Sequence, residues 1–230
     1  MRSQQSSALP SALWYNSTGS KNTALGHFAL RSNTTASNNT AVGMFSIATN
    51  TTGASNVGIG RNSLRANTTG QQNVALGHNS LYNNTGGFGQ VAAGYKSLFN
   101  NTTGNYNVGL GAYGLENNVS GSCNIAIGYE VLKTNTCGDN NVAIGFKAVR
   151  SSTTALNTVG IGSCALYALT TGSDNVAIGT NAMKAYTTGK CSIAIGNDAM
   201  GNTQGQGTTN IAIGLRAGCS LGSSNNIAIG

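Results

Sequence analysis

The amino-acid sequence predicts an all-β fold, a β-solenoid (a parallel β-roll or β-helix) of about thirteen coils of 17 residues each. Three observations predict it: a fixed repeat, an alternation of large and small residues within each repeat, and a recurring turn sequence. Variants of the pentapeptide Asn-Val-Ala-Ile-Gly, found at 141–145, recur along the chain, and the same interval separates their closing glycines ten times in succession from Gly26 to Gly196. The next interval is one position longer and the last is one position shorter, which restores the phase at Gly230. A period this short, held over nearly the whole chain, is typical of stacked repeats.

The first half of each repeat predicts a short β-strand. With the closing glycine numbered zero, positions −3 and −1 are mostly aliphatic and position −2 is always Ala or Gly. An alternation with period two places the −3 and −1 side chains on one face of a strand and the −2 side chain on the other. We expect Val142 and Ile144 to point into the coil and Ala143 to lie on a face that something approaches closely.

The second half of each repeat predicts a second short strand and a turn. Position +3 is small and position +4 is aliphatic, as in Ser63-Leu64, and Asn-Thr-Thr-Gly follows at 67–70. Asn and Gly supply the left-handed backbone that a tight reversal needs. The coil is therefore expected to run strand, corner, strand, turn. Coils stacked about 4.8 Å apart would give a rod on the order of 60 Å long.

Asparagine recurs at two places in the repeat. Position −4 is Asn in ten of thirteen repeats, from Asn22 to Asn226, and stacked identical amides can hydrogen-bond from coil to coil. We expect this column to have a structural role and not to bind a ligand. The turn asparagines, such as Asn50 and Asn67, lie in Asn-x-Ser/Thr sequences and would be exposed glycosylation sites in a eukaryotic secretory host.

Composition limits the classes of partner. The net charge of +7 comes from 12 basic and 5 acidic residues, so the positive bias is sparse and suits anionic glycans as well as it suits a membrane surface or nucleic acid. We expect no nucleic-acid partner. No apolar run approaches the ~20 residues of a membrane helix, so we expect no membrane insertion. Residues 1–5 lack the apolar core of a signal peptide.

No arrangement of residues predicts catalysis, a cofactor or a metal. The Gly-x-Gly-x-x-Gly pattern at 109–114 is a product of the repeat glycines, and no helix is expected after it. His27 and His78 lie three coils apart, the acidic residues are scattered singly, and the five cysteines have no metal spacing. We expect a protein that is not an enzyme.

A stripe of aromatic and basic residues is the most suggestive feature of the variable positions. Position +5 should point outward because it follows the inward position +4. This column contributes Arg31, Arg65, Tyr82, Phe99, Lys133, Arg150, Tyr167 and Lys184, and columns +1 and +2 add Phe28, Phe45, Lys96 and Lys147, among others. Aromatic faces stack on sugar rings and cations attract anionic glycans, so the stripe is a candidate glycan or receptor surface. The alternatives are a solvated surface and aromatic packing between chains.

The pentapeptide and the small residue at +3 resemble the head repeats of trimeric autotransporter adhesins, and similar repeats occur in bacteriophage and viral tail fibres. The resemblance covers residues 11–230 and implies a left-handed parallel β-roll in which three chains pack side by side. It further implies that the −2 column faces the neighbouring chain. The residues concerned are Ala75, Gly109, Ala126, Ala143, Gly160 and Ala177. The longer repeat and its Asn-Thr-Thr-Gly turn favour the fibre relatives.

We therefore expect a lead-in segment at 1–10 and a solenoid at 11–230 that serves as shaft or receptor-binding region of an extracellular, cell-surface or virion fibre. The expected partners are further copies of the chain, as a homotrimer and in end-to-end stacks that complete the half-repeats at 11–19 and 226–230, and a cell-surface glycan or receptor. Three alternatives remain: a bacterial surface adhesin head, a self-assembling extracellular filament subunit, and an ice-binding solenoid prompted by the Thr columns at +8 and +9.

Overall fold

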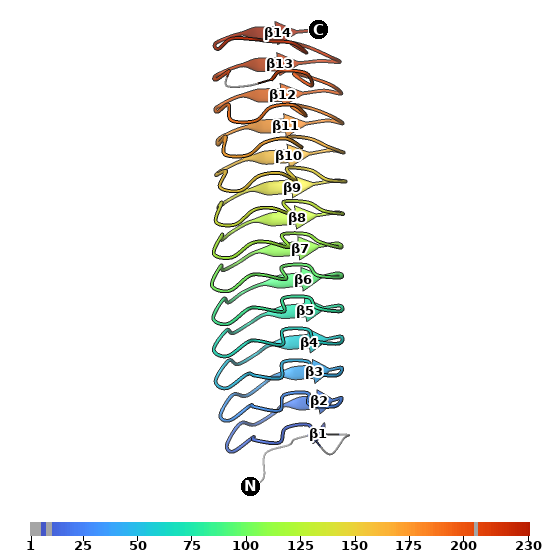
Figure 1. The fold of residues 1–230 in the computed structure, drawn as a ribbon, viewed down its shortest axis with the longest axis vertical. Coiled ribbons are helices and arrows are strands. Elements are labelled where there is room, and N and C mark those ends of the chain that lie inside the picture. Colours follow the sequence, from blue (N-terminus) through green and yellow to red (C-terminus); the bar gives the residue numbers. More distant parts are fainter. Residues whose placement is uncertain (1–5, 8–10, 205–206) are drawn as a thin grey trace. The chain divides into compact units, whose positions relative to one another are not determined.

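Each repeat forms one short strand. In the computed structural model (Figure 1), the described residues are 6–7, 11–204 and 207–230. The chain divides into two compact units, Met1–Ser120 and Gly121–Gly230, called here the first and second unit. The strands of the first unit are β1 (Ser6–Ser7), β2 (Thr23–Leu25), β3 (Thr40–Val42), β4 (Val57–Ile59), β5 (Val74–Leu76), β6 (Val91–Ala93) and β7 (Val108–Leu110). Those of the second are β8 (Ile125–Ile127), β9 (Val142–Ile144), β10 (Val159–Ile161), β11 (Val176–Ile178), β12 (Ile193–Ile195), β13 (Ile211–Ile213) and β14 (Ile227–Ile229).

Within each unit, consecutive strands pair in parallel, so each unit is a parallel β-solenoid (Figure 1). The register follows the repeat: Val142 pairs with Val159 and Ile144 with Ile161. The one longer interval leaves the register unchanged, since Ile193 pairs with Ile211. The predicted all-β solenoid is confirmed. Strand β1 pairs with Thr23 and Ala24 inside the segment expected to be a lead-in, and the other residues of 1–10 lie outside the described part of the chain.

The strand faces the opposite way from the prediction. Ala143 is 0% exposed, whereas Val142 and Ile144 beside it are partly exposed. The second half of the coil passes so close behind the strand that only a small side chain fits: a Cβ placed on Gly160 would lie 2.4 Å from a methyl group of Val149. The interior therefore consists of the −2, +3 and +4 columns, and the expectation that the −3 and −1 side chains fill the coil is wrong.

The predicted second strand is also absent from the described residues. Positions +2 and +4 instead adopt left-handed backbone, as at Asn62 (φ 57°) and Leu64 (φ 51°). A left-handed conformation costs an L-residue roughly 1–2 kcal/mol. Burial of Leu64, worth about 1.5–3 kcal/mol, and the bond from its N–H to the Ser80 carbonyl (3.0 Å) offset this cost. Even the β-branched Ile47 is held at φ 49°.

Two buried asparagine columns join successive coils. At −4, Asn39 Oδ1 accepts the backbone N–H of Asn56 (2.9 Å), and its amide nitrogen donates to the Gly53 carbonyl (3.0 Å). The predicted structural role of this column is confirmed. Most of its bonds run from side chain to backbone, and the predicted amide-to-amide bond also occurs, as from Asn141 Nδ2 to Asn124 Oδ1 (3.0 Å). A longer amide-to-amide chain lies at the turn position +7, where Asn67 Nδ2 donates to Asn50 Oδ1 at 2.7 Å. Both of these turn residues are fully buried, so the expectation that they are exposed glycosylation sites is wrong.

Candidate functional site

Each unit carries an apolar surface that the sequence pattern had assigned to the interior. The outward −3 and −1 side chains of the strands form what we call the aliphatic face of the unit. Leu25 is 48% exposed in the first unit and Ile213 is 41% exposed in the second. None of the three-residue strands contains a charged residue. Contiguous exposed apolar surface of this kind marks an interaction site.

The −2 column cannot supply the inter-chain contacts that the resemblance implied. Ala75, Ala126, Ala143 and Ala177 are fully buried by their own chain. Gly109 also faces inward, because a Cβ there would lie 2.4 Å from Ser97 Oγ. Gly160 faces Val149 in the same way. These residues are small because the coil interior is narrow, so they are not available to a neighbouring chain.

The first unit gathers half of the predicted stripe into a continuous stack. We call it the cation–aromatic ladder, and its members are Phe28, Arg31, Phe45, Arg65, Tyr82, Lys96 and Phe99. Its centre is Arg65, whose guanidinium carbon lies 4.9 Å from the ring centroid of Phe45 and 5.6 Å from that of Tyr82. Arg65 Nη1 also donates to the Tyr82 hydroxyl at 2.7 Å.

The ladder extends in both directions from Arg65. Towards the N-terminus, the rings of Phe45 and Phe28 lie 5.2 Å apart and Arg31 lies 5.1 Å from the Phe28 ring. Towards the C-terminus, Tyr82 stacks on Phe99 with centroids 5.1 Å apart and planes 20° apart. Lys96 Nζ then lies 5.3 Å from the Phe99 ring. The repeat explains this geometry, because side chains separated by one full repeat lie in neighbouring coils.

Most of the positive charge on the ladder has no carboxylate beside it. Among the described residues, no ion pair involves Arg31 or Arg65. Glu116 is the only acidic residue in the sequence of the first unit, and it lies 3.8 Å from Lys96. Cation–π contacts hold the two arginines without neutralising them.

An open hollow lies at the N-terminal end of the ladder. It has a volume of about 270 Å³ and is lined by Trp14, Tyr15, Phe28 and Arg31. Trp14 is 63% exposed and Tyr15 is 56% exposed, so both present aromatic surface to solvent. The prediction of an outer stripe did not include these two residues, since they precede the first complete repeat.

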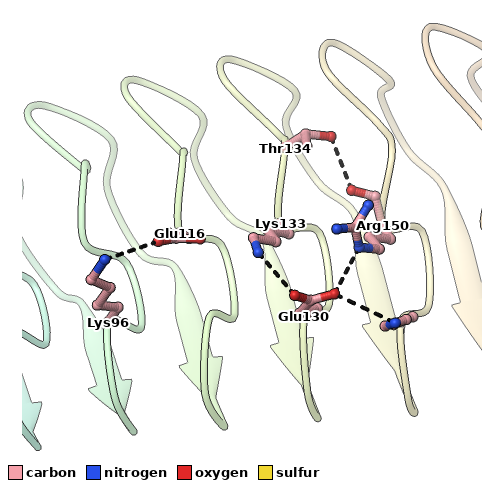
Figure 2. A network of polar contacts seen from close by, with 7 residues as sticks. Lys96, Glu116, Glu130, Lys133, Thr134 and Arg150 are labelled. Atoms are coloured by element: carbon pink, nitrogen blue, oxygen red, sulfur yellow. Dashed lines mark hydrogen bonds and ion pairs between the residues drawn. The ribbon is translucent and has the colours of Figure 1, made fainter.

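In the second unit the same columns form an ion cluster around one carboxylate (Figure 2). Glu130 Oε1 lies 2.9 Å from Lys133 Nζ, and Oε2 lies 2.8 Å from Arg150 Nε. Lys147 Nζ lies 3.8 Å from Oε2. The hydrogen bond from Lys133, together with Arg150, outweighs desolvation and lowers the pKa of Glu130 to about 2. The hydrogen bond to Glu130 in turn raises the pKa of Arg150.

Of the remaining residues of the stripe, Tyr167 lies beside this cluster and Lys184 lies apart from it. Arg150 lies 5.9 Å from the Tyr167 ring, and Lys147 lies 4.9 Å from the Phe146 ring. Lys184 is exposed, and no ion pair or ring contact joins it to the other described residues. The predicted stripe is thus two separate arrangements and one isolated lysine.

Other kinds of site find no support in the described part of the chain. No group of three metal-ligating side chains occurs there, and all five cysteines are free thiols. No helix long and apolar enough to cross a membrane occurs among these residues. Comparison with protein-family models, curated proteins and solved structures found no match to this chain.

Proposed function

We propose that this chain is a non-enzymatic structural segment of an extracellular or virion fibre, in which copies associate side by side as a homotrimer through their aliphatic faces. The observation that carries the proposal is the aliphatic face of each unit: Ile59 is 43% exposed and Ile178 is 37% exposed, among strands without charges. Leaving so much apolar surface in water costs roughly 25 cal/mol per Å².

A second copy of the chain is the partner that fits this face. The aliphatic side chains repeat once per coil, about every 4.8 Å. A surface with the same spacing can interdigitate with these side chains. A second copy of the chain has that spacing because its sequence is identical. The absence of charge on the strands also removes any repulsion between identical faces.

The experiment is a mass measurement on the 23.2 kDa chain by light scattering coupled to size exclusion. Ile59→Lys and Ile178→Lys place charges on the aliphatic faces and should convert a three-chain particle into single chains. Gln72→Lys, at an exposed turn residue, adds the same charge elsewhere and should leave the mass unchanged. A wild-type chain that is monomeric at every concentration would disprove the proposal.

A filament that stacks end to end is a second candidate, and the constant register of the strands favours it. Consecutive strands pair in parallel at equivalent repeat positions in both units, and a second copy carries strands with the same register. Particles that lengthen with concentration, seen by electron microscopy, would favour this candidate over lateral association alone.

The ice-binding alternative gains no support from the threonine columns. At +8 the hydroxyls bond along the solenoid: Thr51 Oγ1 donates to the Thr68 carbonyl (3.0 Å), and Thr68 Oγ1 to that of Thr85 (2.9 Å). At +9 most residues, including Thr52 and Thr69, are exposed, but Thr188 is only partly exposed. A measurement of thermal hysteresis tests this alternative directly.

A further inference from the structure

We propose that the cation–aromatic ladder of the first unit binds an acidic polysaccharide, with Arg31, Arg65 and Lys96 contacting its sulfate or carboxylate groups and the hollow at Trp14 holding a sugar ring. This inference goes beyond the structural role proposed above and does not depend on how many chains associate.

The arginines of the ladder are held in place and still have donors to offer. A guanidinium carries five N–H donors in a planar fork that suits bidentate binding of oxyanions. Arg65 uses one of these donors on the Tyr82 hydroxyl, and the rings of Phe45 and Tyr82 support it. Because this support restricts the side chain before a ligand arrives, less conformational entropy is lost on binding.

The spacing of the cations suits a polymer. Arg31 and Arg65 occupy the same repeat position two coils apart, which corresponds to about 10 Å at the spacing of stacked strands. Lys96, at position +2, lies two coils beyond Arg65 and adds a third cation, 3.8 Å from Glu116. Cations set apart in a row match a sugar chain that carries an acidic group on alternate residues better than they match one small anion.

The use of the ring faces favours a polysaccharide over single-stranded nucleic acid. Nucleic-acid strands stack successive bases on free aromatic faces. In the ladder, Phe45 lies against both Arg65 and Phe28, and Tyr82 lies against both Arg65 and Phe99. The exposed aromatic surface at the hollow is one platform, provided by Trp14 and Tyr15, which suits a single sugar ring.

The test uses the full chain and its single tryptophan, Trp14, whose fluorescence reports on the hollow. A sulfated heparin oligosaccharide should give a saturable fluorescence change that weakens as salt is added. A neutral dextran oligosaccharide should give none. An oligothymidylate strand is the third probe, and tighter binding of this strand than of the sulfated sugar would overturn the choice of ligand.

Matched arginine variants locate the site. Arg65→Ala should weaken binding of the heparin oligosaccharide about tenfold, which is about 1.4 kcal/mol. Arg150→Ala removes the same charge from the second unit, where the guanidinium is already bonded to Glu130, and should change the affinity less than twofold. Equal losses for the two variants, or no binding by the wild-type chain, would overturn the proposal. Particle mass is measured on each variant, so that failure of the fibre proposal is detected separately.

Discussion

The two units place an arginine at the same repeat position and give it opposite environments. Arg65 lies 4.9 Å from the ring of Phe45, which occupies position +2 of the preceding coil. Arg150 bonds at 2.8 Å to Glu130, which occupies the same position in its own preceding coil. The scaffold is the same in both, with φ 59° at Phe45 and 54° at Glu130. One variable side chain therefore decides whether the arginine is bonded to a carboxylate or left available.

This comparison separates two kinds of position in a repeat. The −4, −2 and +4 columns are buried and hold the coil together, so they vary little, whereas the buried +7 column changes from Asn to residues such as Leu169 and Tyr186 in the second unit. Most residues of the +2 and +5 columns reach the surface, although Glu130 is only 8% exposed, and residues as different as Phe45 and Glu130 occupy position +2 with similar backbone. Function can differ between units on one scaffold because the two sets of positions are independent.

The largest expected effect tests whether the interiors are equivalent. Leu64→Ala in the first unit and Leu132→Ala in the second each remove a fully buried side chain. Each should reduce the free energy of unfolding by about 2–5 kcal/mol. Denaturant unfolding measures the free energy of unfolding of each variant. A loss within this range for one variant and outside it for the other would show that the two scaffolds are not alike.

An exchange of the side chains at position +2 tests the comparison directly. Phe45→Glu should neutralise Arg65 and weaken binding of the heparin oligosaccharide by about tenfold or more. Glutamate is compatible with the backbone there, since Glu130 adopts the same conformation. The reciprocal change, Glu130→Phe, should release Arg150 and increase binding by the second unit.

Isothermal titration calorimetry measures both variants, and far-UV circular dichroism checks that each is folded. If Phe45→Glu binds as tightly as the wild-type chain, neutralisation from position +2 does not control the arginine.

The smallest expected effect is a pH dependence of stability in the second unit. The pKa of Glu130 is lowered from its ordinary value of 4.5 to about 2. Its stabilising contribution is therefore complete above the unfolded pKa and is lost as the pH falls from about 4.5 to 2. Since Lys133, Lys147 and Arg150 are partly exposed, we expect a contribution on the order of 1 kcal/mol.

Thermal unfolding of the wild-type chain and Glu130→Gln at pH 6, 4 and 2 measures this contribution. The difference between them should be largest at pH 6 and vanish near pH 2. Glu116→Gln is the control, because the Glu116 carboxylate lies 3.8 Å from Lys96, a longer contact than those of Glu130 with Lys133 (2.9 Å) and Arg150 (2.8 Å), and its loss should change stability less at pH 6. A difference that persists at pH 2 would contradict the assignment to the charge of Glu130.

The candidate site was only partly predictable from the sequence. The +5 column identified Arg65, Tyr82 and Arg150 as surface residues, because an outward position follows an inward one. It did not show that Arg150 is bonded to Glu130, since that pairing joins residues of neighbouring coils, at positions +2 and +5. The predicted stripe also did not include Trp14, which lines the hollow together with Arg31.

The sequence by itself determined the solenoid, the length of its coil and its parallel register, because a fixed period allows equivalent residues to pair only with each other. The tertiary structure alone decided which side of the strand faces inward. A period of two shows that Val142 and Ala143 point to opposite sides, but not which side is the interior. The narrow coil admits only the methyl group of Ala143, so the larger aliphatic residues lie outside, on the surface that we propose for self-association.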